Sequence, residues 1–557
     1  MSVVVFEQNQ SFVINSFKSG NFDYVDITTE IQEREFFQFL LDKEIIQHLG
    51  EIYPTPRKKE EVPAWAAVCT NISLRIHRSH SFYSFPYIVR IGGLIDALGP
   101  RIAERKINKE KKTIELRCHG FNNKNQYSRT TPWDQDFVRK FCKDTAPDLL
   151  MDWYNRGVNW CIRKLTGYDN DGMFIGDSTY LFVPNNPKYE GSALLLFDEH
   201  NHPVDPDKVD ASLIKKGKYI WRRCYQMVSI IHTNRNKKFF AIVALRIIGG
   251  KANPLHPLYS LVKDFVNREG KGIMKRLILD RGFISGKDIS RCKKKLDIDV
   301  IIGLRKNMDL LDDTLRLIAG FKHEWKEYKI KNNNEKESNR ILPPAIQKRE
   351  EKRQQTLKKK KKEKEEKEGK EVILEKVLVT GIHNFNIWES CKVPMHTVVS
   401  REIYSDGHED LWVLSTTEDF QDPIQIRRDY ELRPLIEERH RQFKLFWDLT
   451  KFHSVSFSLV VNQVVSTLLT YSLFQIRNLY TFQGDLNPIT FPQLKMELKS
   501  KADRVVVYYK QYFAFQIFHE FCEMLLILEE TAKGKVLKKM RKIKNELFDL
   551  DYSPRPP

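Results

Sequence analysis

Four polar residues near position 430 have a spacing that suits a ligand site on one side of a helix. Arg433, Glu437 and Lys444 follow Tyr430 at offsets of 3, 7 and 14 residues. At about 100° per residue, these offsets place all four side chains within an arc of roughly 60° on one helical face. A helix usually turns an apolar stripe towards the core, so a polar stripe faces either solvent or a ligand. Both interpretations are open on spacing alone.

Two aspartates upstream follow short apolar runs. Residues 172–176 precede Asp177 and residues 275–279 precede Asp280, and each run predicts a buried strand that ends at its aspartate. In sheets flanked by helices, ligands bind outside the strand ends, so two such carboxylates and one from a helix can meet at one point. Either aspartate alone can instead be a helix cap or a turn residue.

Together these residues resemble the DDE transposases of bacterial insertion sequences. The resemblance is to the cut-and-paste branch, whose third carboxylate lies in a Tyr-x2-Arg-x3-Glu-x6-Lys signature. Tyr430, Arg433, Glu437 and Lys444 match this signature without a gap. The similarity covers roughly residues 170–480, and it includes the long, strand-rich insertion that this branch carries before the glutamate.

One residue departs from the expected helical signature. Pro434 lies inside it, and proline disfavours helical angles in the residue before it and cannot donate to the preceding turn. We therefore expect the helix to begin or kink at Pro434. Tyr430 and Arg433 would then lie on a separate segment from Glu437.

The resemblance implies that Asp177, Asp280 and Glu437 are the catalytic residues and hold two Mg²⁺ ions, for which Mn²⁺ can substitute. Three neighbouring carboxylates repel one another unless a cation lies between them. Two hard cations can activate an attacking water or 3′-hydroxyl and stabilise the leaving oxygen at phosphorus. The expected reaction is metal-dependent DNA strand cleavage and strand transfer. Glu438 is the alternative ligand, but it lies about 100° around the helix from Glu437.

The resemblance also implies DNA-binding roles for four residues. Lys444 would contact a phosphate near the cut, and Tyr430 and Arg433 would hold the phosphates of a flipped nucleotide. Trp412 takes the place of a tryptophan on which the flipped base stacks while the DNA forms a hairpin. A surface role for Lys444 and a core role for Trp412 are the alternatives.

The composition agrees with a polyanionic partner. The formal net charge is +19 over 557 residues, and basic residues with aromatics between them run through the chain. We expect double-stranded DNA, both transposon ends and target, as the partner, and a homodimer in the DNA complex by analogy with the family. The eight cysteines form no Cys-x2-Cys pair, and the N-terminal residues show no secretory signal, so we expect a cytoplasmic, nucleoid-associated protein.

The order of expected elements predicts an α/β fold with an RNase H-like mixed sheet flanked by helices. A strand, a hairpin, a helix, a strand, a helix and a strand follow one another up to residue 304. We expect a helical N-terminal region that binds the DNA ends (1–150), the catalytic domain in two parts (151–306 and 420–480), a β-rich insertion between them (307–419) with a charged segment (348–371), and a helical basic C-terminal region (481–557).

An uncharged stretch follows the signature. Residues 455–476 are long enough to span a membrane, but their many hydroxyl and amide groups suit a helix packed behind the sheet, so we expect no membrane contact.

Two other functions are compatible with the carboxylates and the signature: a transposase-derived protein that binds specific DNA without cutting it, and an RNase H-fold nuclease without strand transfer. The intact set of carboxylates argues against the first of these.

Overall fold

The computed structural model divides the chain into two compact units. The first unit comprises Met1–Asn170, Asp177–Glu269 and Ile436–Pro557, and the second comprises Asp171–Gly176 and Gly270–Leu435. The charged segment 348–371 lies outside the described residues. The described residues are 4–6, 10–22, 24–28, 31–58, 63–77, 81–82, 103–108, 113–118, 135–235, 240–305, 308–329, 374–384, 388–449, 451–482, 504–509 and 512–539.

The second unit is built on a mixed sheet with a parallel centre. Strand β10 pairs in parallel with the first residues of β5 on one side and with β11 on the other. These runs are almost wholly apolar, as parallel strands covered on both faces require. The sheet continues through β15, β14, β13 and β12, each antiparallel to its neighbour. The strands are β5 (Met173–Val183), β10 (Arg276–Leu279), β11 (Asp299–Gly303), β12 (Lys326–Glu327), β13 (Leu374–Ile382), β14 (His396–Tyr404) and β15 (Glu409–Thr416).

Strands β13, β14 and β15 confirm the β-rich insertion. Val399 of β14 and Val413 of β15 are buried in one hydrophobic cluster with Ile318. The helices of this unit are α11 (Gly286–Arg291, continued by a π-helical turn at Cys292–Leu296), α12 (Asp309–Gly320) and α14 (Pro423–Tyr430).

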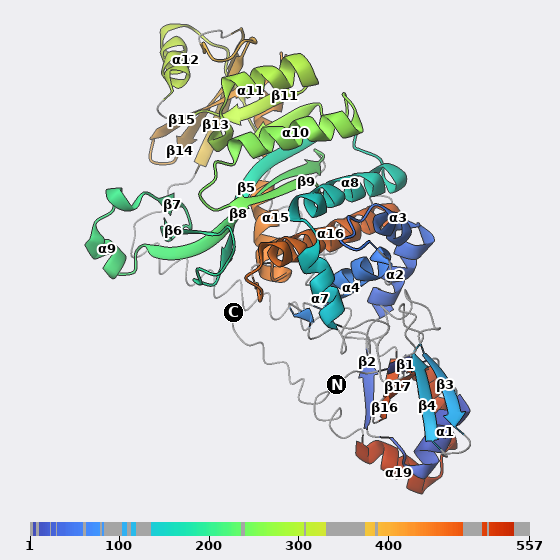
Figure 1. Cartoon of the computed structure of the whole chain (residues 1–557). Coiled ribbons are helices and arrows are strands. Elements are labelled where there is room, and N and C mark those ends of the chain that lie inside the picture. Colours follow the sequence, from blue (N-terminus) through green and yellow to red (C-terminus); the bar gives the residue numbers. More distant parts are fainter. Residues whose placement is uncertain are drawn as a thin grey trace. The chain divides into compact units, whose positions relative to one another are not determined.

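The first unit contains the predicted hairpin. Strand β8 neighbours β5, pairs with β6 through its first residues, and pairs with β9 through the remainder. Helices α8, α10 and α16 pack against β9, and Figure 1 shows α8 and α16 running side by side. The elements are β6 (Ala193–Phe197), β7 (Pro203–Val204), β8 (Ile220–Thr233), β9 (Phe240–Gly249), α2 (Ile31–Asp42), α3 (Ile45–Glu51), α4 (Ala64–Ile76), α7 (Gln135–Asp144), α8 (Pro147–Leu165), α9 (Ala211–Lys215), α10 (Leu255–Glu269), α15 (Pro434–Phe446) and α16 (Phe457–Phe482).

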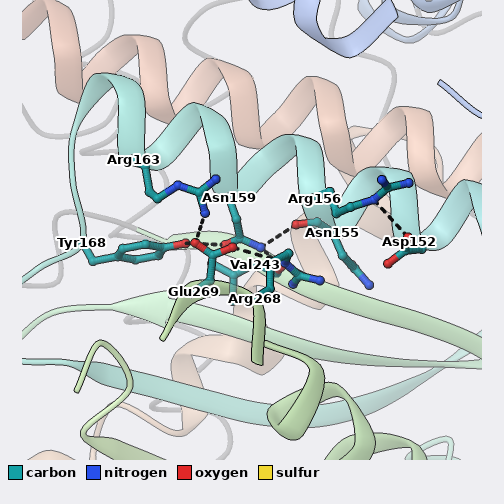
Figure 2. Close-up of polar contacts among 9 residues, drawn as sticks. All are labelled: Asp152, Asn155, Arg156, Asn159, Arg163, Tyr168, Val243, Arg268 and Glu269. Atoms are coloured by element: carbon teal, nitrogen blue, oxygen red, sulfur yellow. Dashed lines mark hydrogen bonds and ion pairs between the residues drawn. The ribbon is translucent and has the colours of Figure 1, made fainter. Parts of the chain in front are cut away.

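Two asparagines of α8 bond to the backbone of β9. The amide of Asn155 both accepts from the Leu245 N–H at 2.8 Å and donates to its carbonyl at 3.3 Å, while Asn159 donates to the Val243 carbonyl at 2.7 Å. Figure 2 shows Asn159 between Val243 and the Tyr168 hydroxyl, which in turn donates to Glu269. These side chains satisfy strand groups that a further strand would otherwise bind.

Helix α16 is the uncharged stretch of the sequence analysis. It is long and apolar enough to span a membrane, but 89% of its most apolar window is buried inside the protein. Two of its hydroxyls are satisfied within the helix, since Thr467 and Thr470 each donate to the carbonyl one turn back. The Asn462 amide donates to Asn71. The expectation of a helix packed inside the protein is therefore confirmed.

A separate small sheet joins residues from both ends of the chain. Its order is β1-β17-β16-β2, and Figure 1 shows the blue and red strands side by side. Buried side chains from its strands and helices, including Phe17, Val507 and Phe521, form one core. We call this sheet and its helices the terminal module. Its elements are β1 (Val4–Phe6), α1 (Gln10–Ser19), β2 (Tyr24–Thr28), β16 (Arg504–Tyr509), β17 (Tyr512–Ile517), α18 (Phe518–Ile527) and α19 (Glu530–Lys539); β3 (Ala103–Asn108) and β4 (Thr113–Cys118) form a further pair.

The terminal module corrects one detail of the sequence analysis. We expected a helical C-terminal region (481–557), whereas β16 and β17 form a hairpin there. The reason is the alternation of Val505 and Val507, which are both fully buried, with residues on the opposite face. Period-two burial of β-branched residues favours a strand.

Candidate active site

The signature residues lie on two helices. Helix α14 ends at Tyr430 and α15 begins at Pro434, so a single helical face carrying all four residues is wrong. Between them the chain makes a turn in which the Arg433 N–H donates to the Tyr430 carbonyl at 2.9 Å. Proline suits the first position of a helix because that position needs no N–H donor. The expected start at Pro434 is therefore confirmed.

Asp177 lies within a strand, where we expected a strand end. Strand β5 continues past it to Val183. The last residue of β5 that pairs with β10 is Gly176, opposite Leu279. Asp177 is therefore the first residue of β5 beyond that pairing. Its side chain is buried, 8% exposed, and one carboxylate oxygen accepts from the Ser178 N–H at 2.7 Å.

Asp280 directly follows the other member of the same pair, Leu279. It occupies the position before a short 3-10 turn, but its side chain makes no capping hydrogen bond, which excludes the helix-cap interpretation. Its carboxylate instead lies 3.4 Å from the Arg433 guanidinium. Arg305 donates to the carbonyls of Arg281 and Gly282 and so fixes the loop that follows.

Helix α15 is oriented by a buried stripe. Ile436, His440 and Phe443 are buried, and the His440 ring lies 3.1 Å from the Ser229 hydroxyl of β8. These residues recur at helical spacing, so Glu437 and Lys444 share the adjoining face. The Glu437 side chain is exposed.

Glu438, the alternative third carboxylate, forms its hydrogen bonds within α15. Both oxygens of Glu438 accept from the Arg441 guanidinium, at 2.6 and 2.7 Å, and Gln442 donates to one of them. Arg441 thereby lowers the pKa of Glu438 below its usual value. These bonds hold the Glu438 carboxylate against its own helix.

Lys444 reaches back towards β5. Its ammonium donates to the Thr179 hydroxyl at 2.7 Å, two residues beyond Asp177 on the same face of the strand. Burial lowers the pKa of Lys444 to about 8, and the Asp177 carboxylate opposes part of that shift. The first unit therefore brings Asp177 and Lys444 into one electrostatic environment.

Trp412 is half-buried, and a guanidinium packs on one face of its indole ring. The Arg427 guanidinium lies 4.1 Å from its ring centroid, and its indole N–H donates to Glu402 at 2.8 Å. Arg427 is also 3.5 Å from Glu402 and 3.2 Å from Glu431. Trp412 is therefore partly exposed, and the Arg427 guanidinium covers one face of its ring.

Tyr430 lies close to Trp412, with ring centroids 6.2 Å apart and planes tilted by 43°. Its hydroxyl occupies space beside Gly303 at the end of β11, only 2.9 Å from where a Cβ on that glycine would stand. A larger residue at position 303 would displace the ring. The second unit thus brings Tyr430 and Trp412 together and pairs Arg433 with Asp280.

A second group of side chains could hold a metal. His383, His396 and Asp419 each place a ligand atom within 4.8 Å of the others. They come from the end of β13, the start of β14 and the residue range after β15, so no short sequence motif marks them. Two imidazoles and one carboxylate suit zinc or another nitrogen-preferring metal better than magnesium.

Comparison with known proteins gives one family. The family model described as a transposase DDE domain matches residues 190–473, about half of the chain. That stretch contains Asp280, Trp412 and the whole signature, and it begins after Asp177. No curated protein matches the sequence.

Proposed function

Because the chain belongs to the family of DDE transposases, we propose that it cuts DNA at the ends of an insertion sequence and joins those ends to a target, with Asp177, Asp280 and Glu437 as its catalytic residues. One observation carries the choice of aspartates: Asp177 and Asp280 each follow one member of the last pair between β5 and β10. When two parallel strands share their last residue pair, the residue that follows it on each strand lies at the same edge of the sheet.

The donor set fits magnesium. Asp177, Asp280 and Glu437 offer only hard carboxylate oxygens, which Mg²⁺ and Mn²⁺ prefer, and Asp280 is not used as a helix cap. Two such ions would activate the attacking water or 3′-hydroxyl and stabilise the leaving oxygen. Arg433, 3.4 Å from Asp280, would hold that carboxylate in place and offset its charge.

The carboxylates are tested by matched amide substitutions. We expect Asp177→Asn, Asp280→Asn and Glu437→Gln each to lower Mg²⁺-dependent cleavage about a hundred- to a thousandfold, because a catalytic metal supplies several kcal/mol. Glu438→Gln is the control, since Glu438 is bound to Arg441. Cleavage and joining are measured on DNA from the flanks of the gene.

The same assay separates the other functions. Binding of the flanking DNA without cleavage would identify a DNA-binding protein that no longer cuts, and cleavage without joining would identify a nuclease. Normal cleavage by Glu437→Gln together with loss in Glu438→Gln would contradict the assignment of the third carboxylate. Cutting two ends in concert requires two active sites, so we propose a homodimer on DNA.

For excision we propose a hairpin intermediate in which one base leaves the stack near the cut. Trp412 would support that base, with Tyr430 and Arg433 holding phosphates of the same nucleotide. Since Arg427 covers one face of the indole at 4.1 Å, the base would take the other face or replace the guanidinium. On the opposite face of the indole from the base, the positive charge of Arg427 would attract the π-electrons of Trp412 and so strengthen the stacking surface.

Replacing Trp412 tests the hairpin route. Stacking contributes on the order of 1–3 kcal/mol, so we expect Trp412→Ala to nick DNA normally but form hairpin roughly ten- to a hundredfold more slowly. Trp325→Ala is a matched control, since Trp325 also lies under an arginine, Arg401, at 4.4 Å. Nicked DNA is measured over time on sequencing gels. Double-strand breaks in the parent protein without any hairpin would overturn this route.

A further inference from the structure

The first unit contains a pocket that none of the signature residues lines. It has a volume of about 350 Å³ and is lined by residues of α4, α7, the segment before α16 and the first turns of α16. This volume is within the range of ligand-binding pockets in proteins. Arg75, Arg139, His453 and Gln463 are among its polar lining residues.

Among the residues that line the pocket, Arg75 is unusual. It lies in the last turn of α4, its side chain is almost fully buried at 6% exposure, and its Nε makes no hydrogen bond within the described part of the chain. Burial lowers the pKa of Arg75 to about 10, so the guanidinium stays charged at neutral pH. The titratable group that acts on Arg75 is the Cys142 thiol, whose pKa burial raises to about 12 and which is therefore neutral.

A buried charge without a counter-charge is costly, by several kcal/mol in a typical interior. Asp136 also lines the pocket, but it lies 3.4 Å from Arg139, so these two charges offset each other. Across the residues that the structure describes, no carboxylate forms an ion pair with Arg75. The pocket therefore keeps an excess of positive charge.

Helix ends add to that excess. Gln135 and Asp136 form the first turn of the ten-residue α7, and Leu459 and Asn462 lie in the first two turns of α16. The start of a helix carries roughly half a positive charge and unpaired N–H donors, which favour anions. A guanidinium and the first turns of two helices line one pocket, and such groups supply the donors that bind phosphate.

We propose that this pocket binds a phosphate group, with Arg75 as its principal donor. The phosphate could belong to the DNA backbone or be free in solution, and the chemistry of recognition is the same for both. The DNA source rests on the proposed function, whereas binding of free phosphate does not.

Thermal unfolding with inorganic phosphate tests the pocket itself. At constant ionic strength, we expect phosphate to raise the Tm of the parent protein by a few degrees relative to chloride, because a ligand of the folded state stabilises it. Arg75→Met should lose this response, while its Tm without phosphate equals or exceeds that of the parent because an unpaired buried charge is gone. Arg156→Met, an exposed arginine of α8 paired with Asp152 (Figure 2), should keep the response.

Arg139→Gln provides a second variant in case Arg75→Met does not fold, since Arg139 is about half exposed and lies in the same pocket. We expect its response to phosphate to be reduced. An equal rise in phosphate and chloride for the parent protein, or an unchanged phosphate response in both pocket variants, would overturn the proposal.

DNA binding in EDTA distinguishes the two sources of phosphate. If a backbone phosphate occupies the pocket, Arg75→Met should weaken binding to a duplex about tenfold and reduce the slope of log K against log salt by about 1. If free phosphate is the ligand, the thermal response is lost but DNA affinity is unchanged. A parent protein that binds no DNA would contradict the proposed function and leave the thermal result intact.

Discussion

The ammonium of Lys444 lies in surroundings that disfavour its charge. Burial lowers its pKa to about 8, against about 10.4 for a free lysine. Between these values the unfolded chain holds the proton more tightly than the folded protein does. Raising the pH through this window therefore increases the contribution of Lys444 to the free energy of unfolding.

The same shift predicts a pH dependence of DNA binding. In EDTA, we expect the affinity of the parent protein for duplex DNA to fall as the pH rises above about 8, because the neutral amine no longer attracts phosphate. Lys444→Arg should keep its affinity to pH 9.5, since arginine stays protonated. Fluorescence anisotropy at constant ionic strength measures both.

Lys444→Met should bind weakly at every pH, and Lys208→Met, which removes an exposed lysine, should follow the parent profile. Identical pH profiles for the parent protein and Lys444→Met would remove Lys444 from the DNA contact.

At the scale of single residues, spacing in the sequence was a good guide to the arrangement of the candidate residues. It was a poor guide to the side chains that they contact. The position of Pro434 correctly predicts that the signature is divided between two segments, and the helical angle separates Glu438 from Glu437. The Arg427 guanidinium on Trp412 was missed. That contact joins a helix to a strand, and no fixed sequence offset encodes it.

At the scale of elements, the asparagines of α8 act as a substitute for a neighbouring strand. Asn155 both donates to and accepts from the backbone of Leu245, which is the exchange that a paired strand residue makes. These bonds satisfy backbone groups of β9 without another strand, and they fix the position of α8 on the sheet.

Removing that amide should loosen β9. We expect Asn155→Leu to destabilise the protein by about 1–3 kcal/mol for each backbone group left unsatisfied. Faster hydrogen exchange of the Leu245 amide would report the change locally, and thermal unfolding would report it globally. Asn185→Ala removes an exposed asparagine and should leave both unchanged. Unaltered exchange at Leu245 in Asn155→Leu would show that the strand needs no such partner.

Element type was largely predictable where periodicity was strong. The hairpin of β8 and β9 follows directly from two apolar runs in the sequence. The continuation of β5 beyond Asp177 was not predictable. A polar residue inside a buried run looks like a strand end, because sequence shows the change of polarity and not the pairing partner.

At the scale of the whole molecule, the terminal module depends on both ends of the chain. Strand β2 pairs with β16, and β1 pairs with β17, through backbone hydrogen bonds that no local segment can replace. Side chains from both ends fill its core. Damage to either end should therefore weaken the other.

A buried substitution tests this dependence. We expect Val507→Asp in β16, which places a charge in the core, to speed hydrogen exchange of the amides of residues 24–28. Leu526→Asp is the matched control, since Leu526 of α18 is 78% exposed. Equal exchange of residues 24–28 in the two variants would show that β2 is stable without β16.

Pairing of this kind could not be predicted from the sequence. Each strand of the module is short, and the β2 and β16 segments are separated by more than four hundred residues. Local patterns of hydrophobicity identify a strand but carry no information about a partner so distant.

The module also sets an order of events during protein synthesis. Strands β1 and β2 leave the ribosome first, yet their partners β17 and β16 are made only after more than four hundred further residues. At about 5–20 residues per second, that wait is roughly half a minute or longer. The edges of β1 and β2 remain without their native partners throughout, and a polypeptide released before residue 504 never acquires them.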